Sequence, residues 1–188
     1  MLLQLPHIFV DIGLLFVALF ILIVVSAFFS ASETGLMTLN RYRLKHQVQQ
    51  GKRSARLAEK LLSEPDKLIS LILMGKNFGD NAATVVATLL TIQLFGDAEW
   101  ALGAATALLT VVMLIFADAA PKTLAAIHPE RVAYPAAVIL APLQWLLTPV
   151  IWVTSRVTRQ ILRLFGVGDE EAANHSLSQE ELRTVVVE

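Results

Sequence analysis

The chain has 188 residues, of which 55% are hydrophobic and 16% are charged, and its formal net charge is −1. A soluble globular domain is about 45 to 50% apolar, so this composition favours a membrane protein over a soluble one. The chain contains no cysteine, which excludes disulfides and thiolate metal sites, so any bound metal ion would need oxygen or imidazole ligands.

The first predicted membrane helix covers residues 8–36. No lysine or arginine occurs before Arg41, whereas a secretory signal peptide carries basic residues ahead of its apolar core, so this segment is interpreted as a retained helix. The positive-inside rule places the basic stretch that follows in the cytoplasm and the N-terminus outside. The basic residues of that stretch are Arg41, Arg43, Lys45, Lys52, Arg53, Arg56, Lys60 and Lys67.

Residues 41–64 alternate apolar and charged side chains, which predicts amphipathic juxtamembrane helices on the inner membrane surface. Gly51 is the expected break between them, and Pro65 the expected stop. Anionic lipid is the expected partner of residues 41–67, in preference to nucleic acid. A solvated cytosolic helical hairpin remains the alternative interpretation of this stretch.

The second and third membrane helices are predicted at residues 68–95 and 100–117. A bilayer crossing needs about 20 mostly apolar residues; the first segment exceeds that length and the second approaches it. Residues 96–99 connect them and contain no basic residue, so this connection is expected outside.

Residues 132–155 are also long enough to cross, but basic residues flank them at both ends. Lys122 and Arg131 lie before the segment and Arg156 follows it. The segment also contains three prolines, each of which removes a backbone donor and disturbs a helix. We therefore favour a Pro-rich re-entrant helical hairpin, with a kinked fourth crossing as the alternative. The prolines are Pro135, Pro142 and Pro149.

These segments together predict an all-α membrane protein with a transmembrane domain at residues 1–165. Residues 166–188 turn polar, and Ser178 with Glu181 fits the spacing of a helix capping box. This region is interpreted as the start of a cytosolic domain that continues beyond Glu188.

Polar side chains interrupt the predicted membrane helices at three places. In the first helix, Ser26 and Ser30 are four residues apart and share a helix face, with Glu33 near the membrane boundary. Hydroxyls at this spacing could bind a cation or serve only in helix packing. In the third helix, Asp118 precedes Pro121, which has no N–H to donate to a carbonyl one turn earlier. An acidic group beside a free carbonyl would suit a hard cation, although an ordinary helix terminus is equally compatible.

The second helix carries the densest polar group. Lys76 and Asp80 are four residues apart, close enough for an ion pair, and Asn77 with Asn81 forms a second row beside them. Ionisable residues inside a membrane cost a few kcal/mol each and usually mark a functional path or binding site. Interhelical hydrogen bonding is the alternative. No zinc spacing or phosphate-binding loop occurs, so an enzyme is not expected.

Four stretches resemble the CorB/CorC magnesium transport proteins, which are related to the cyclin M transporters. The stretches are residues 26–41 (SAFFSASETGLMTLNR), 66–71 (DKLISL), 121–125 (PKTLA) and 176–184 (SLSQEELRT). The resemblance implies three crossing helices, a short helical hairpin and a juxtamembrane helix, assembled as a homodimer. It also implies nucleotide-binding CBS domains in the cytosol beyond Glu188.

The resemblance implies transport of Mg2+ across the bacterial inner membrane, outward and in exchange for Na+, through a site between the helices. The implied metal ligands are Ser26, Ser30, Gly75, Asn77, Asp80, Ala117 and Asp118, and residues expected to modulate the site are Lys76, Glu33, Asn81 and Pro121. A membrane anchor or ion sensor that does not transport is the alternative function.

This sequence departs from the family pattern at the site itself. Lys76 and Asp80 stand where the family commonly has asparagine, Ala117 stands for glycine, and Asp118 stands for glutamate. A protonated lysine only donates hydrogen bonds and cannot ligate a metal. Lys76 could therefore pair with Asp80 or Asp118 and compete with Mg2+, or it could point away and leave Asp80 as a stronger ligand.

Overall fold

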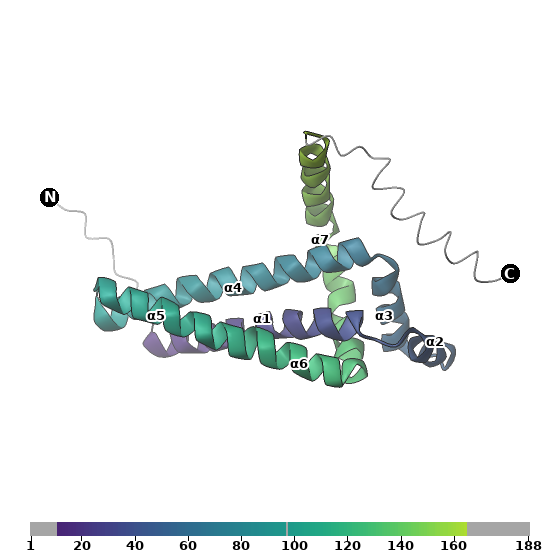
Figure 1. Ribbon diagram of the computed structural model, residues 1–188, viewed down its shortest axis with the longest axis horizontal. Coiled ribbons are helices and arrows are strands. Elements are labelled where there is room, and N and C mark those ends of the chain that lie inside the picture. Colours follow the sequence, from purple (N-terminus) through teal and green to yellow (C-terminus); the bar gives the residue numbers. More distant parts are fainter. Residues whose placement is uncertain (1–10, 97, 165–188) are drawn as a thin grey trace. The chain divides into compact units, whose positions relative to one another are not determined.

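The computed structural model describes residues 11–96 and 98–164, and these residues form helices without any strand (Figure 1). The all-α prediction is confirmed for this part of the chain. The chain divides into two compact units, Met1–Trp145 and Leu146–Glu188. The polar region at 166–188 and residues 8–10 of the predicted first helix lie outside the described residues.

Helix α1 (Ile12–Met37) is the central element of the first unit. Asp11 caps its N-terminus by accepting a hydrogen bond from the Gly13 amide at 2.9 Å. With 26 residues at 1.5 Å rise per residue, the helix exceeds the roughly 30 Å of a bilayer core. It packs mainly against α4 (Pro65–Phe95), and also against η1 (Met113–Ala119) and α6 (Ala120–Ile127).

The two juxtamembrane helices are α2 (Arg41–Gln49) and α3 (Arg53–Ser63). Gly51 separates them with a φ of 81°, a left-handed conformation that favours glycine. Helix α3 buries one apolar face made of Ala55, Ala58, Leu61 and Leu62. Pro65 then begins α4 at a position where its missing N–H costs nothing. The predicted break and stop are therefore both confirmed.

Helix α4 begins three residues before the predicted start and approaches α1 closely through two glycines. Gly75 lies directly against the ring of Phe29, and a Cβ added at Gly79 would lie 3.5 Å from Ser26. Small residues allow this close approach. Close packing matters here because lipid tails are as apolar as the side chains, so the hydrophobic effect does not drive helix association inside a membrane.

The predicted helix end at Ala117 is wrong. Helix α5 (Glu99–Val112) continues through η1, a π-helical segment, into α6, so the helical run extends to Ile127. In η1 the Ala120 amide bonds to the carbonyl of Ile115, five residues earlier. The wider turn carries the helix into Pro121 without a break, and such π-segments occur frequently at functional sites.

The hairpin predicted at residues 132–155 is also wrong in the described chain. Helix α7 runs without a turn from Pro129 to Leu164. Its three prolines are seven residues apart, so they share one helix face and each removes a single donor. The alternative of a proline-containing helix is the one observed. Four helices of the described residues are long and apolar enough to cross a membrane, including Pro129–Val150.

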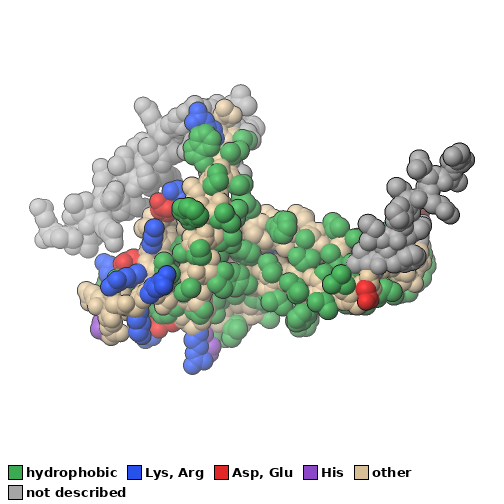
Figure 2. Space-filling view, turned by 180° about the vertical axis from the view of Figure 1, so that it is seen from behind, with side chains coloured by type: hydrophobic (Ala, Val, Ile, Leu, Met, Phe, Trp, Pro, Cys, Tyr) green, Lys and Arg blue, Asp and Glu red, His purple; other side chains and the backbone are tan. Residues whose placement is uncertain are grey.

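The surface of the long helices is apolar, as expected for lipid contact. Figure 2 shows hydrophobic side chains spread over the helices and basic side chains gathered at the end where α2 and α3 lie. Large apolar side chains such as Phe20, Phe78 and Leu114 are at least 60% exposed. In a soluble protein such a surface would aggregate, whereas here it fits a bilayer.

The contact between Gly75 and Phe29 gives a first prediction. Gly75→Ala places a Cβ against the ring of Phe29, which is 7% exposed and has little room to move. We expect the free energy of unfolding to fall by about 1 to 3 kcal/mol, as in overpacked cores. Thermal melting in one detergent measures this. Gly103→Ala in α5 is the matched control, because nothing lies within 4 Å of its added Cβ. Equal melting temperatures for the two variants would contradict the packing argument.

Candidate cation site

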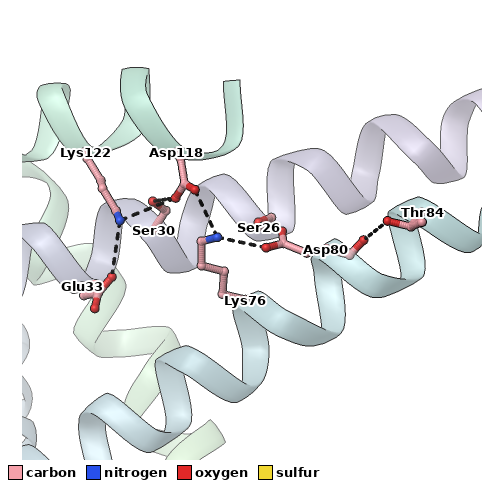
Figure 3. A network of polar contacts seen from close by, with 8 residues as sticks. All are labelled: Ser26, Ser30, Glu33, Lys76, Asp80, Thr84, Asp118 and Lys122. Carbon is pink, nitrogen blue, oxygen red and sulfur yellow. Dashed lines mark hydrogen bonds and ion pairs between the residues drawn. The ribbon is translucent and has the colours of Figure 1, made fainter. Parts of the chain in front are cut away.

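The centre of the candidate site is Lys76, whose ammonium lies between two aspartates. Its Nζ is 2.9 Å from Oδ2 of Asp80 and 3.3 Å from Oδ2 of Asp118 (Figure 3). Asp80 follows Lys76 by one turn of α4, whereas Asp118 belongs to η1. The side chains are only 18%, 31% and 33% exposed, respectively. One ammonium therefore links two membrane segments that are far apart in the sequence.

Two serines of α1 complete the aspartate pair. The hydroxyl of Ser26 donates a hydrogen bond to Oδ1 of Asp80, and the hydroxyl of Ser30 donates to Oδ1 of Asp118 at 2.9 Å. Both serines are fully buried. Each aspartate thus contacts one hydroxyl and the shared ammonium. The serines do more than fill the helix interface, because both are directed at the acidic pair.

A second lysine extends the charged cluster toward the C-terminal end of α1. Lys122 Nζ lies 3.6 Å from Oδ1 of Asp118 and 3.9 Å from Oε2 of Glu33. The contact of Lys122 with Asp118 was not predicted, although their spacing of four residues is typical of an ion pair on one helix face. Figure 3 shows the result, which is a row of alternating charges from Glu33 through Lys122, Asp118 and Lys76 to Asp80.

Several residues expected at the site do not contact this cluster. Asn77 and Asn81 lie at exposed positions of α4, turned away from the face that carries Lys76 and Asp80. Gly75 contacts Phe29 instead. Ala117 is buried beside Asp118, and Pro121 is half-buried in α6. The interpretation in which Lys76 pairs with Asp80 and Asp118 matches the observed geometry, and the one in which it points away does not.

The oxygens at this site suit a hydrated hard cation better than a tightly caged one. No group of three or more His, Asp or Glu side chains within the described ranges is arranged to hold a metal. Mg2+, however, usually keeps several of its waters and binds through one or two carboxylates. Asp80 and Asp118, with the hydroxyls of Ser26 and Ser30, offer such a set. The ammonium of Lys76 occupies the space between the carboxylates, so a cation must displace it.

Comparison with known proteins gives a consistent family assignment. Residues 17–188 match the model of the cyclin M transmembrane N-terminal domain. The chain is 51% identical over 164 residues to the UPF0053 inner membrane protein YfjD of Escherichia coli, covering 87% of this chain and 38% of that protein. It is 41% identical over 179 residues to a UPF0053 protein of Haemophilus influenzae, covering 95% of this chain and 42% of that protein.

A more distant relative has a name that states a function. The chain is 28% identical over 172 residues to the polyamine export protein of Salmonella typhimurium, covering 79% of this chain and 36% of that protein. The chain therefore spans about two fifths of the length of these curated relatives, as the covered shares of 36 to 42% show.

The shared ammonium predicts a stability effect. Lys76→Met leaves two half-buried carboxylates without their shared ammonium, and Asp118 keeps only its longer contact with Lys122 at 3.6 Å. We expect the free energy of unfolding to fall by about 1 to 3 kcal/mol when divalent ions are absent. Added Mg2+ should restore more stability to this variant than to the unchanged protein. Thermal melting with and without Mg2+ measures both effects. Lys67→Met is the matched control on the same helix, because Lys67 forms an exposed ion pair with Glu64. Its loss is expected to lower the free energy of unfolding by less than about 1 kcal/mol. Equal losses in the two variants would show that Lys76 does not balance the aspartates.

Proposed function

Because this chain belongs to the cyclin M transmembrane domain family, we propose that it transports Mg2+ across the bacterial inner membrane through the site between α1, α4 and η1. The carrying observation is that Asp80 and Asp118, from two different segments, share one positive charge inside apolar helices. The ammonium of Lys76 lies between the two carboxylates. When the ammonium moves away, a transported cation can bind to both carboxylates in its place.

In this proposal Lys76 is a tethered competitor of the transported ion. With the ammonium in place, the charge of the two aspartates is partly compensated and the site is closed to a cation. When Mg2+ arrives, it takes both carboxylates and the ammonium moves into the adjoining pocket, which has a volume of about 310 Å3 and Lys76 in its lining. The divalent ion gains two carboxylates, which offsets part of the cost of removing its waters.

The remaining features of the transporter are proposed from the family and from the charge distribution. Transport is outward in exchange for Na+, and the protein is a homodimer. The N-terminus lies outside and the C-terminus in the cytoplasm, because the basic residues of α2 and α3 gather at one end of the helices (Figure 2). Those basic residues contact anionic lipid. Nucleotide binds only in the cytosolic domain that the family implies.

A second candidate cargo is an organic amine. The aspartate pair already binds a primary ammonium, that of Lys76, and the Salmonella relative is named a polyamine export protein. Flux measurements with Mg2+ and with a linear polyamine, in the same vesicles, separate the two cargoes. A membrane anchor or ion sensor would bind the cation without moving it, so it would give no flux with either.

The Mg2+ proposal predicts that Asp118→Asn abolishes transport. The variant removes one of the two carboxylates and leaves an amide, which is a weaker ligand for a hard cation. We expect Mg2+ flux to fall by about a hundredfold or more in vesicles containing the full-length protein, which corresponds to roughly 2.7 kcal/mol. Glu99→Gln serves as the control, because it neutralises an exposed carboxylate at the start of the same helical run. Unchanged flux in Asp118→Asn would refute the proposed site.

The competitor role of Lys76 has its own test. Lys76→Asn removes the ammonium and supplies an amide oxygen, so Mg2+ no longer has to displace a bound charge. We expect Mg2+ affinity, measured by calorimetry, to rise by about tenfold, equivalent to 1.4 kcal/mol. Lys60→Asn, which changes an exposed lysine of α3, controls for the loss of one positive charge. An equal or lower affinity in Lys76→Asn would mean that Lys76 does not compete with the ion.

A further inference from the structure

A pocket of about 310 Å3 opens beside the ion pairs, between α4 and the α5–η1 segment. Lys76, Asp80 and Asp118 form part of its lining, and three threonines, Thr84, Thr106 and Thr110, form another part. The threonines lie nearer than the aspartates to the turn at Gly96 that joins α4 and α5, because the two helices run in opposite directions from it. The pocket thus extends from the charged cluster toward that end of the helices.

The threonine hydroxyls present acceptor oxygens to this pocket. Each donates its hydrogen to the carbonyl four residues earlier in its own helix, at 2.9 Å for Thr84 and 2.8 Å for Thr106 and Thr110. A hydroxyl has one hydrogen and two lone pairs, so the lone pairs remain for water or a cation. Threonines also form such bonds where they face lipid, but here three of them converge on one pocket beside an acidic pair.

The opposite side of the ion pairs is closed. The ring of Phe29 lies against Gly75, and Gly79 lies close to Ser26, so α1 and α4 leave no space there. Lys122 bridges Asp118 and Glu33 on the same side. Figure 3 shows Glu33 and Lys122 on one side of Lys76 and Thr84 on the other. The pocket that adjoins the aspartate pair thus lies on the side that carries the threonines.

We propose that this threonine-lined pocket is a water-filled access path that connects Asp80 and Asp118 to the non-cytoplasmic side of the membrane. The path rests on the proposed cation site, because it is the route by which the ion would reach Asp80 and Asp118. A water occupies about 30 Å3, so the pocket holds about ten, and a magnesium ion with six waters needs about 180 Å3. The ion can therefore keep its waters along the path and exchange some of them for carboxylate oxygens at the pair.

Cysteine labelling tests the path, because this chain has no cysteine of its own. Thr110→Cys is introduced into the full-length protein, with any cysteine elsewhere replaced by serine, and exposed to a membrane-impermeant cationic methanethiosulfonate from either side. The reactive thiolate forms in water and not in lipid. Val85→Cys is the matched control, because Val85 follows Thr84 directly on α4, is 59% exposed, and does not line the pocket.

We expect Thr110→Cys to react about tenfold or more faster than Val85→Cys when the reagent is added from the non-cytoplasmic side. Thr106→Cys, one turn closer to that side, provides a second position if Thr110→Cys does not fold. Reaction from the cytoplasmic side alone, or at the rate of Val85→Cys, would overturn the path.

The same labelling separates the path from its cargo. Slower labelling of Thr110→Cys in the presence of Mg2+ would place the ion in the path and support both proposals. Fast labelling that Mg2+ does not slow, in a protein without Mg2+ flux, would support the path and contradict Mg2+ as the cargo.

Discussion

The structure of the first unit depends on one constraint, which is that charges inside a membrane must neutralise one another. Lys76 satisfies Asp80 on its own helix and Asp118 on another, and neither aspartate would be stable there without a cation. This arrangement requires α1, α4 and η1 to meet at one place. The glycines of α4 permit that approach, and the buried serines of α1 bond to the aspartates from the third side.

The π-segment η1 follows from the same constraint together with a proline. Pro121 cannot donate to a carbonyl of the preceding turn. A broken helix would leave further backbone groups unpaired in lipid, where each costs several kcal/mol. Widening to a five-residue repeat instead pairs the Ala120 amide with Ile115 and keeps the run intact to Ile127. Asp118 lies within this widened turn, so the irregularity that accommodates the proline also positions the carboxylate that contacts Lys76.

The helices, the break and the ion pair that depend on local spacing could be predicted from the sequence. The effects of proline inside a membrane and the contacts between distant residues could not. The long apolar helices, the break at Gly51 and the pairing of Lys76 with Asp80 follow from composition, a left-handed glycine and a spacing of four residues. The expectation that proline ends a helix is wrong at Pro121 and in α7. In a membrane helix, neighbouring groups and local changes of helix geometry pair the backbone groups that proline leaves free, so the helix continues. The bridge from Lys122 to Glu33 joins residues 89 positions apart, and no local pattern specifies that contact.

The charge of the whole cluster explains why a residue that opposes ion binding is nevertheless present. Glu33, Asp80 and Asp118 supply three negative charges, and Lys76 and Lys122 supply two positive ones, so the cluster carries a net charge of −1. In the proposed exchange, a divalent cation replaces the ammonium of Lys76, so three negative charges then meet the single charge of Lys122 and the two charges of the ion, and the net charge is 0. Without the two lysines the cluster would hold three carboxylates and no cation, a state that an apolar surrounding disfavours strongly. In the proposed function, Lys76 lowers the affinity for a cation and stabilises the cation-free site, and a transporter needs both properties because its site must release the ion as well as bind it.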